Sequence, residues 1–313
     1  MGREVIARYQ AQPSPAKPVQ GDALISNATI IQSVLSGLLE GGNYALYSLG
    51  LAFVFGIMQI INMAHGEFLV LGGYVAYWLL VKLGIDPLPA LPIAALLAGG
   101  VSFLSYRVFI ERIRTTVELN TLILTFGIGI FLSNVYLQLW SADLRSISVD
   151  WMSNTVKISG IYISLGEMIT FFISFAAVVL LHFFLRRTKA GKAIRITAID
   201  RDAAALSGIN VERVDLMAYS IGGMLAGLAG PLLGMLSFVS PGTGIGITVK
   251  AFILTVLAGV GSIPGLIAAG MILGVGEALT VTFLSSSLRE LFGFTLFLMI
   301  LLVRPSGLFG KRG

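Results

Sequence analysis

The stretch that decides the fold is INMAHGEFLVLGGYVAYWLL, Ile61–Leu80, in which a long apolar run follows an asparagine, a histidine and a glutamate. The chain around it is 56% hydrophobic and only 12% charged, against about 25% charged residues in ordinary soluble domains. Three further apolar runs, Leu119–Leu139, Tyr162–Leu185 and Val214–Val239, reach the roughly 20 residues that a helix needs to cross a bilayer. These features predict an all-α, polytopic integral membrane protein with about 8–10 transmembrane helices, some of them broken by glycine.

The composition also excludes several kinds of site. The chain has no cysteine, so disulfides and cysteine metal sites are impossible, and its two histidines, His65 and His182, are too few for a histidine-rich metal site. We therefore expect no metal. The His-Glu-x-x-His motif of metalloproteases is also missing, because no second histidine lies four residues after His65. The net charge of +5 resides in a few short connectors, a distribution typical of cytoplasmic loops rather than of nucleic-acid binding.

The chain divides into three parts by polarity. Residues 1–24 are polar and proline-rich, predicting a disordered tail without a cleavable signal. Residues 25–304 form the predicted transmembrane domain, which begins with an apolar segment, Ile25–Ile61, interrupted at Glu40-Gly41-Gly42. Two basic connectors, 107–118 and 186–213, are placed in the cytoplasm by the positive-inside rule, and the short tail 305–313 follows on the same side. The side of the N-terminus stays open.

The polar group Asn62, His65 and Glu67 has two interpretations. It is either a helix break whose polar groups line a translocation path, or the cytoplasmic turn between the first two spans, with Asn62 and Glu67 capping helix ends. The turn is favoured, because the group falls at a span boundary and a glutamate suits the first turn of a helix.

Three more polar residues lie inside apolar sequence. Glu40 and Asn43 indicate a helix break near the outer interface or a pair that faces the protein interior, and the two are about equally supported. Glu277, in GVGEALTV, either faces a polar cavity or pairs locally.

The segment GGMLAGLAGPLLG contains glycines at every fourth position, in two G-x-x-x-G pairs. Small residues at this spacing let helix backbones approach closely. We therefore expect tight helix packing at Gly223, Gly227, Gly230 and Gly234.

The connector 186–213 is more than a polar linker. Its isoleucines and alanines alternate with charges, and the sequence IDRDAAALSGIN, which contains Asp200, then predicts a short helix that Asp202 caps and Gly208 ends. Such a helix in a cytoplasmic loop is typical of a docking surface for a soluble partner.

At this loop the chain resembles a known family. Asp202-Ala203-Ala204-x-x-x-Gly208 is similar to the Glu-Ala-Ala-x-x-x-Gly coupling loop of bacterial ABC importer permeases, with aspartate in place of the usual glutamate. Together with NMAHGEF and GVGSIPG, it resembles the permeases of branched-chain amino acid importers from about Ile30 to Phe309. Close relatives carry urea or short amides, so the resemblance leaves the solute open.

The resemblance implies an assembly in the bacterial inner membrane. It would comprise two homologous or identical permease subunits, two cytoplasmic ATPases and an extracytoplasmic binding protein that delivers branched-chain or other hydrophobic amino acids. The chain has no G-x-x-x-x-G-K-[ST] loop for phosphate, so ATP and magnesium would bind the ATPase. We expect a transporter subunit that is not an enzyme and holds no cofactor. The rival class is an ion-coupled secondary transporter, which would use Glu40 and Glu277 and would need no docking loop.

Overall fold

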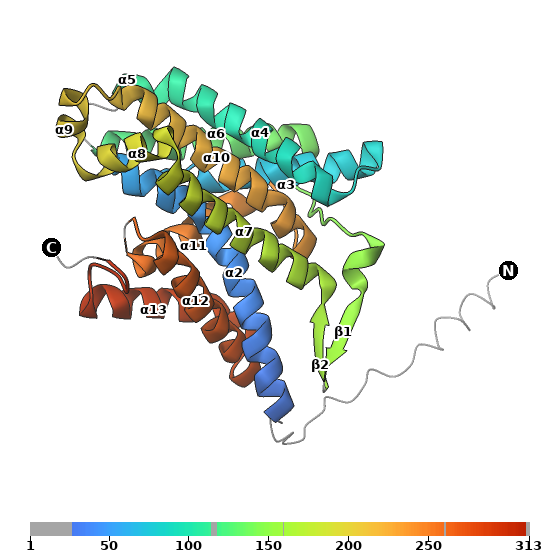
Figure 1. Cartoon of the computed structure of the whole chain (residues 1–313). Helices are drawn as coiled ribbons and strands as arrows, with labels where there is room; N and C mark the ends of the chain where they lie inside the picture. The colour runs from blue at the N-terminus through green and yellow to red at the C-terminus, as the bar shows by residue number, and fades with distance from the viewer. Residues whose placement is uncertain (1–26, 114–117, 159, 260, 311–313) are drawn as a thin grey trace, which may run out of the picture.

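The structure, a computed structural model, describes residues 27–113, 118–158, 160–259 and 261–310. Helices make up nearly all of it, and they pack side by side around one long central helix (Figure 1). In chain order the helices are α2 (Asn27–Met58), α3 (His65–Leu83), α4 (Pro87–Ser105), a π-helical turn (Tyr106–Ile110), α5 (Glu111–Ile113), α6 (Glu118–Trp140), α7 (Leu165–Arg187), α8 (Lys189–Ile199), α9 (Arg201–Leu206), α10 (Val211–Leu236), α11 (Thr243–Ala258), α12 (Ile263–Phe283) and α13 (Arg289–Val303).

Eight helical segments in the described part of the chain are long and apolar enough to cross a bilayer. The predicted all-α, polytopic architecture is thereby confirmed. The eight differ in burial: 83% of the most apolar window of α2 is buried inside the protein, but only 6% of the window in the last span. α2 is therefore the core helix, and the other spans are less buried, from 56% of the window in α10 down to the 6% of the last span.

The predicted interruption at Glu40-Gly41-Gly42 is wrong, because α2 runs through it as a continuous helix. Gly37 and Gly41 serve packing against α12 instead. A Cβ built on Gly41 would lie 2.5 Å from the carbonyl oxygen of Gly270, and one on Gly37 would lie 2.7 Å from that of Gly274. Only glycine permits this backbone approach, so these residues join two helices rather than end one.

The glycines of α10 lie at close contacts with its neighbours. Gly223 and Gly227 pack against α4, where an added Cβ would lie 2.2 Å from Ser102 Cβ and 2.4 Å from Ala98 Cβ respectively. Gly230 packs against the backbone of α3, and Gly234 faces the side chain of Ile147. Replacing any of the first three would force the helices apart.

The segment between α6 and α7 is more ordered than a loop. It contains a 3-10 turn (Asp150–Ser153) and an antiparallel hairpin of β1 (Thr155–Ile158) and β2 (Ile161–Ser164), which lies beside the start of α2 (Figure 1). Gln32 of α2 fixes the hairpin by accepting a 2.8 Å hydrogen bond from the amide of Tyr162 and donating one of 2.7 Å to its carbonyl. The predicted disordered tail, residues 1–24, and the last three residues of the predicted tail 305–313 lie outside the described residues.

Candidate functional site

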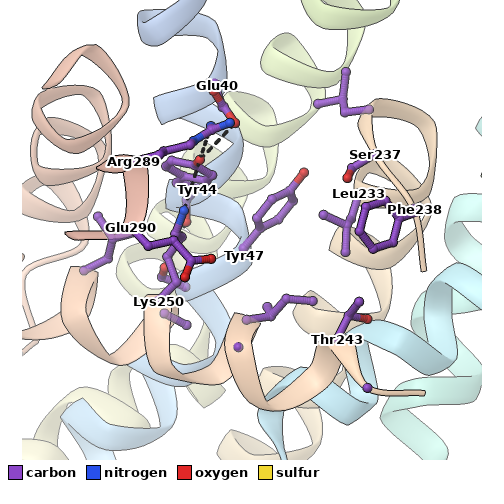
Figure 2. Close-up of a pocket in the computed structure, with 17 residues that line it drawn as sticks. Glu40, Tyr44, Tyr47, Leu233, Ser237, Phe238, Thr243, Lys250, Arg289 and Glu290 are labelled. Carbon is purple, nitrogen blue, oxygen red and sulfur yellow. Dashed lines mark hydrogen bonds and ion pairs between the residues drawn. The ribbon is translucent and has the colours of Figure 1, made fainter. Parts of the chain in front are cut away.

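A pocket of about 430 Å³ lies near the middle of α2. α2 contributes residues from Glu40 to Ser48, and the other lining residues come from the end of α10 and the residues after it, from α11 and from the start of α13 (Figure 2). α11 begins at Thr243, which lines the pocket, so the positive end of the α11 macrodipole lies at the pocket.

One wall of the pocket carries a network of ion pairs. Arg289 pairs with Glu40 and, at 2.9 Å from its Nε to Oε2, with Glu277. Lys250 Nζ lies 3.0 Å from Oε1 of Glu277 and donates a 3.2 Å hydrogen bond to its Oε2. The hydroxyl of Tyr44 links the pairs, because it donates a 2.7 Å hydrogen bond to Glu277 and accepts one of 3.2 Å from Lys250.

The members of this network differ in exposure. The side chain of Glu277 is fully buried, whereas those of Lys250, Arg289 and Glu40 are 29%, 35% and 38% exposed. Glu277 does not line the pocket, and of its two predicted interpretations the structure shows the paired one. Glu277 therefore holds the two cations in place, and the other three charges face the pocket.

The opposite side of the pocket is more apolar. Leu233 of α10 and Phe238, just beyond the end of that helix, lie there with Ser237 and Thr243 (Figure 2). The lining of the pocket also includes the apolar side chains of Leu236, Ile247 and Leu254. The pocket thus offers both signs of charge at one side and hydrocarbon at the other. That arrangement suits a small molecule with a zwitterionic end and an apolar body.

Asn62, His65 and Glu67 form a closed joint at the start of α3 instead of lining this pocket. Each is at most 3% exposed. Asn62 Oδ1 accepts a 3.1 Å hydrogen bond from the amide of Ala64, and His65 Nε2 lies 2.7 Å from the carbonyl oxygen of Tyr47 on α2. These polar groups therefore satisfy the backbone where the chain turns between two helices.

Glu67 is the exception within the joint. Its carboxylate lies against Gly244 in the first turn of α11, where an added Cβ would be 2.1 Å from Oε1. Neither carboxylate oxygen has a hydrogen-bond partner among the described residues. The carboxylate does not cap its own helix, as the sequence had suggested, but faces the N-terminal end of another one.

Asn43 lies on α2 close to Glu40 but faces away from the pocket. Its side chain is buried and bonds two residues of α7: Nδ2 donates to Thr170 at 3.3 Å, and Oδ1 accepts from Ser174 at 2.8 Å. It is therefore a packing contact between spans. Neither Glu40 nor Asn43 marks a helix break.

The predicted docking loop folds as two short helices, α8 and α9. Asp200, rather than Asp202, caps α9 by accepting hydrogen bonds from the amides of Asp202 and Ala203 at 3.0 and 2.9 Å. Gly208 ends the element in the left-handed conformation, at φ +81°.

Exposure within this loop differs from what the sequence suggested. Ala204 is fully buried against its own chain and leaves no side chain at a docking surface, whereas Ala203 is exposed. The prominent apolar side chains are those of Ile199 and Leu206, 82% and 90% exposed. Arg201 turns inward, where it pairs with Asp215 of α10 and donates a 3.3 Å hydrogen bond to the carbonyl of Ile57.

Sequence reasoning missed Tyr44, Lys250 and Arg289, which complete the pocket wall. A signal was present for the two cations, since each begins an apolar run and an ionisable residue there indicates function. The sequence could not predict which acids these cations pair with, because Arg289 and Glu40 lie 249 positions apart.

A bundle of membrane-spanning helices with an amphiphilic pocket at mid-span and a helical element at one end is the architecture of a membrane transporter subunit. The chain belongs to the family described as branched-chain amino acid transport system / permease component, which it matches over residues 33–304.

Relatives across this family cover nearly the whole chain. The high-affinity branched-chain amino acid transport system permease protein LivH of Escherichia coli is 34% identical over 90% of this chain and 96% of its own length. BraD of Pseudomonas aeruginosa, a permease protein of the same description, is 33% identical over the same shares. LivM of Escherichia coli, a second permease protein with that description, is 28% identical over 85% of this chain and 67% of its own. These relatives are transport components, not enzymes.

Proposed function

We propose that this permease admits branched-chain amino acids, or other hydrophobic ones, to the cytoplasm through the pocket at mid-span. The observation that carries the proposal is the pocket's two-sided lining. Lys250, Arg289 and the start of α11 favour a carboxylate, Glu40 favours an ammonium, and the leucines and Phe238 favour a hydrocarbon side chain. Urea and short amides match this lining poorly, because they carry no ionic groups and little hydrocarbon.

The proposal is tested by uptake of labelled leucine and labelled urea in cells that lack the chain and carry it again on a plasmid. Restored leucine uptake with unchanged urea uptake is the expected result. Restored urea uptake alone would reject the substrate and leave the permease family membership untouched.

The orientation follows from charge. The basic connectors 107–118 and 186–213 place the C-terminal ends of α5 and α7 on the cytoplasmic side of the cytoplasmic membrane. α8 and α9 then lie in the cytoplasm, where the exposed side chains of Ile199 and Leu206 offer apolar surface to a protein partner. In the proposed importer a second permease completes the passage, an extracytoplasmic protein delivers the solute, and these two side chains dock a separate ATPase that binds ATP and magnesium.

The ATPase contact is tested by Leu206→Asp, with Leu144→Asp as the matched control. Leu144 is also exposed, at 66%, but lies between α6 and the hairpin, on the other side of the membrane in this orientation. Leu206→Asp should lower ATPase recovery in pull-downs at least about tenfold, the loss of one buried apolar anchor, without lowering permease amounts. Equal recovery with both variants would remove Leu206 from the contact. Uptake that persists without ATP would favour the secondary transporter.

A further inference from the structure

An apolar groove of about 440 Å³ runs between α7 and α10, on a different side from the pocket. All ten side chains that line it are apolar. They include Ile173, Leu180 and Phe184 of α7 and Ile221, Leu225 and Leu228 of α10.

The groove has the depth of one lipid leaflet. Phe184 lies eleven positions after Ile173 on α7, and at about 1.5 Å per position this is roughly 16 Å. Half of a hydrocarbon core is about 15 Å. The groove also ends within one turn of Arg187, where α7 itself ends, so it lies in the leaflet next to the basic connector.

A basic cluster closes that end of the groove. We define it as Arg186, Arg187, Lys192 and Arg195, which together line a cavity of about 620 Å³. Arg187 lies on the same face of α7 as the residues that line the groove, because it follows Phe184 at helical spacing. All four side chains are exposed, and none forms an ion pair in the part of the chain that the structure describes.

The turn from α7 into α8 brings the four charges together. Thr188 caps α8 by accepting a 2.9 Å hydrogen bond from the amide of Gly191. Gly191 lies directly on the end of α7, where an added Cβ would be 2.3 Å from the carbonyl oxygen of Phe184. α8 therefore folds across the end of α7 (Figure 1), and Lys192 and Arg195, at helical spacing, lie beside the two arginines.

We propose that this groove and the basic cluster bind one anionic phospholipid. An acyl chain fills the groove, and the phosphate lies among the four cations, which suit phosphate oxygens and lie where an anionic headgroup would be. Charge complementarity and leaflet depth single out a lipid over a protein helix, because a helix in the groove would leave the four cations unpaired.

The test uses the purified full-length permease, stripped of lipid and given phosphatidylglycerol or phosphatidylcholine with identical acyl chains. Native mass spectrometry counts the bound lipids. The wild type should retain one phosphatidylglycerol in preference to phosphatidylcholine, and replacing all four cations by glutamine should lower that preference at least about tenfold. Arg112→Gln, which removes an exposed charge from the other basic connector, should leave it unchanged.

A second variant tests the groove separately. Ala176→Trp places a large ring among the lining residues and should reduce retention of the lipid, whereas Leu96→Trp, at an exposed apolar position on α4, should not. Unchanged retention with Ala176→Trp would overturn the proposal. So would a four-glutamine variant that keeps its lipid preference but loses its ATPase or its second permease, since the cluster would then be a protein-docking surface.

Discussion

Two polar clusters lie within the apolar body of this permease, and they differ in what their polar groups satisfy. In the joint between α2 and α3, Asn62 and His65 are almost completely buried and bond the backbone. In the pocket wall, Lys250, Arg289 and Glu40 keep about a third of their side-chain surface exposed although they are paired. Under the proposed function, polar residues at membrane depth therefore mark a solute site only where the polar groups remain accessible.

Burial also differs between residues of one cluster. Glu277 belongs to the pocket network but shares the complete burial of the joint. It holds the two cations in place, whereas Glu40 lines the pocket and, in the proposed function, presents its charge to the solute. Loss of Glu277 should accordingly resemble loss of a structural residue, and loss of Glu40 should resemble loss of a binding residue.

The largest effect is expected from Glu277→Leu. This change leaves Lys250 without any carboxylate partner among the described residues, and an unpaired charge of that kind costs about 3–5 kcal/mol. The yield of monodisperse permease and its thermal unfolding midpoint should both fall. Glu277→Gln should do less damage, because the amide keeps a hydrogen-bond acceptor. A stable Glu277→Leu variant with impaired transport would place Glu277 in the solute site instead.

Gly66→Ala should come next, as a test of the joint. The added methyl carbon would lie 1.9 Å from the carbonyl oxygen of Gly244 and 2.6 Å from Thr248 Oγ1. Such overpacking costs about 1–3 kcal/mol, so folded permease should decrease and transport per folded molecule should not. The control is Gly127→Ala in α6, where the new carbon meets nothing within 4 Å. Normal stability of Gly66→Ala would show that the joint can open.

Glu40→Gln should change stability least. The side chain of Glu40 is 38% exposed, and exposed ion pairs contribute about 1 kcal/mol or less. Leucine uptake should nevertheless fall about tenfold, the loss of one charged hydrogen bond to the solute. Asp143→Asn, an exposed acid outside the pocket, should not alter it. Full uptake with Glu40→Gln would remove this residue from the solute path.

Local signals in the sequence were sufficient for the fold class and for the short helix in the connector 186–213. Apolar runs of membrane length predict the spans, and DRDAAALSGIN predicts the short helix and its glycine turn. The same local reasoning failed at Gly41 and Gly42, because a glycine that breaks an isolated helix and a glycine that packs against another helix look alike in one sequence.

The candidate site was predictable only in part. Glu40 and Glu277 were identified because acids inside apolar runs are rare. Their roles depend on Tyr44, Lys250 and Arg289, which only the packing of α2, α11, α12 and α13 brings together. Ala204 shows the same limit, since its burial depends on how α9 lies against the rest of the chain.

The central claim is that solute reaches the pocket and not the joint, and the absence of cysteine from the chain makes it directly testable. Ser237→Cys places a thiol at an exposed position in the pocket wall, and Ala64→Cys places one at the fully buried joint. With a small charged thiol reagent, Ser237→Cys should react, and leucine with the binding protein should slow that reaction, while Ala64→Cys should not react. Leucine-sensitive labelling of Ala64→Cys, with none at Ser237→Cys, would contradict the account.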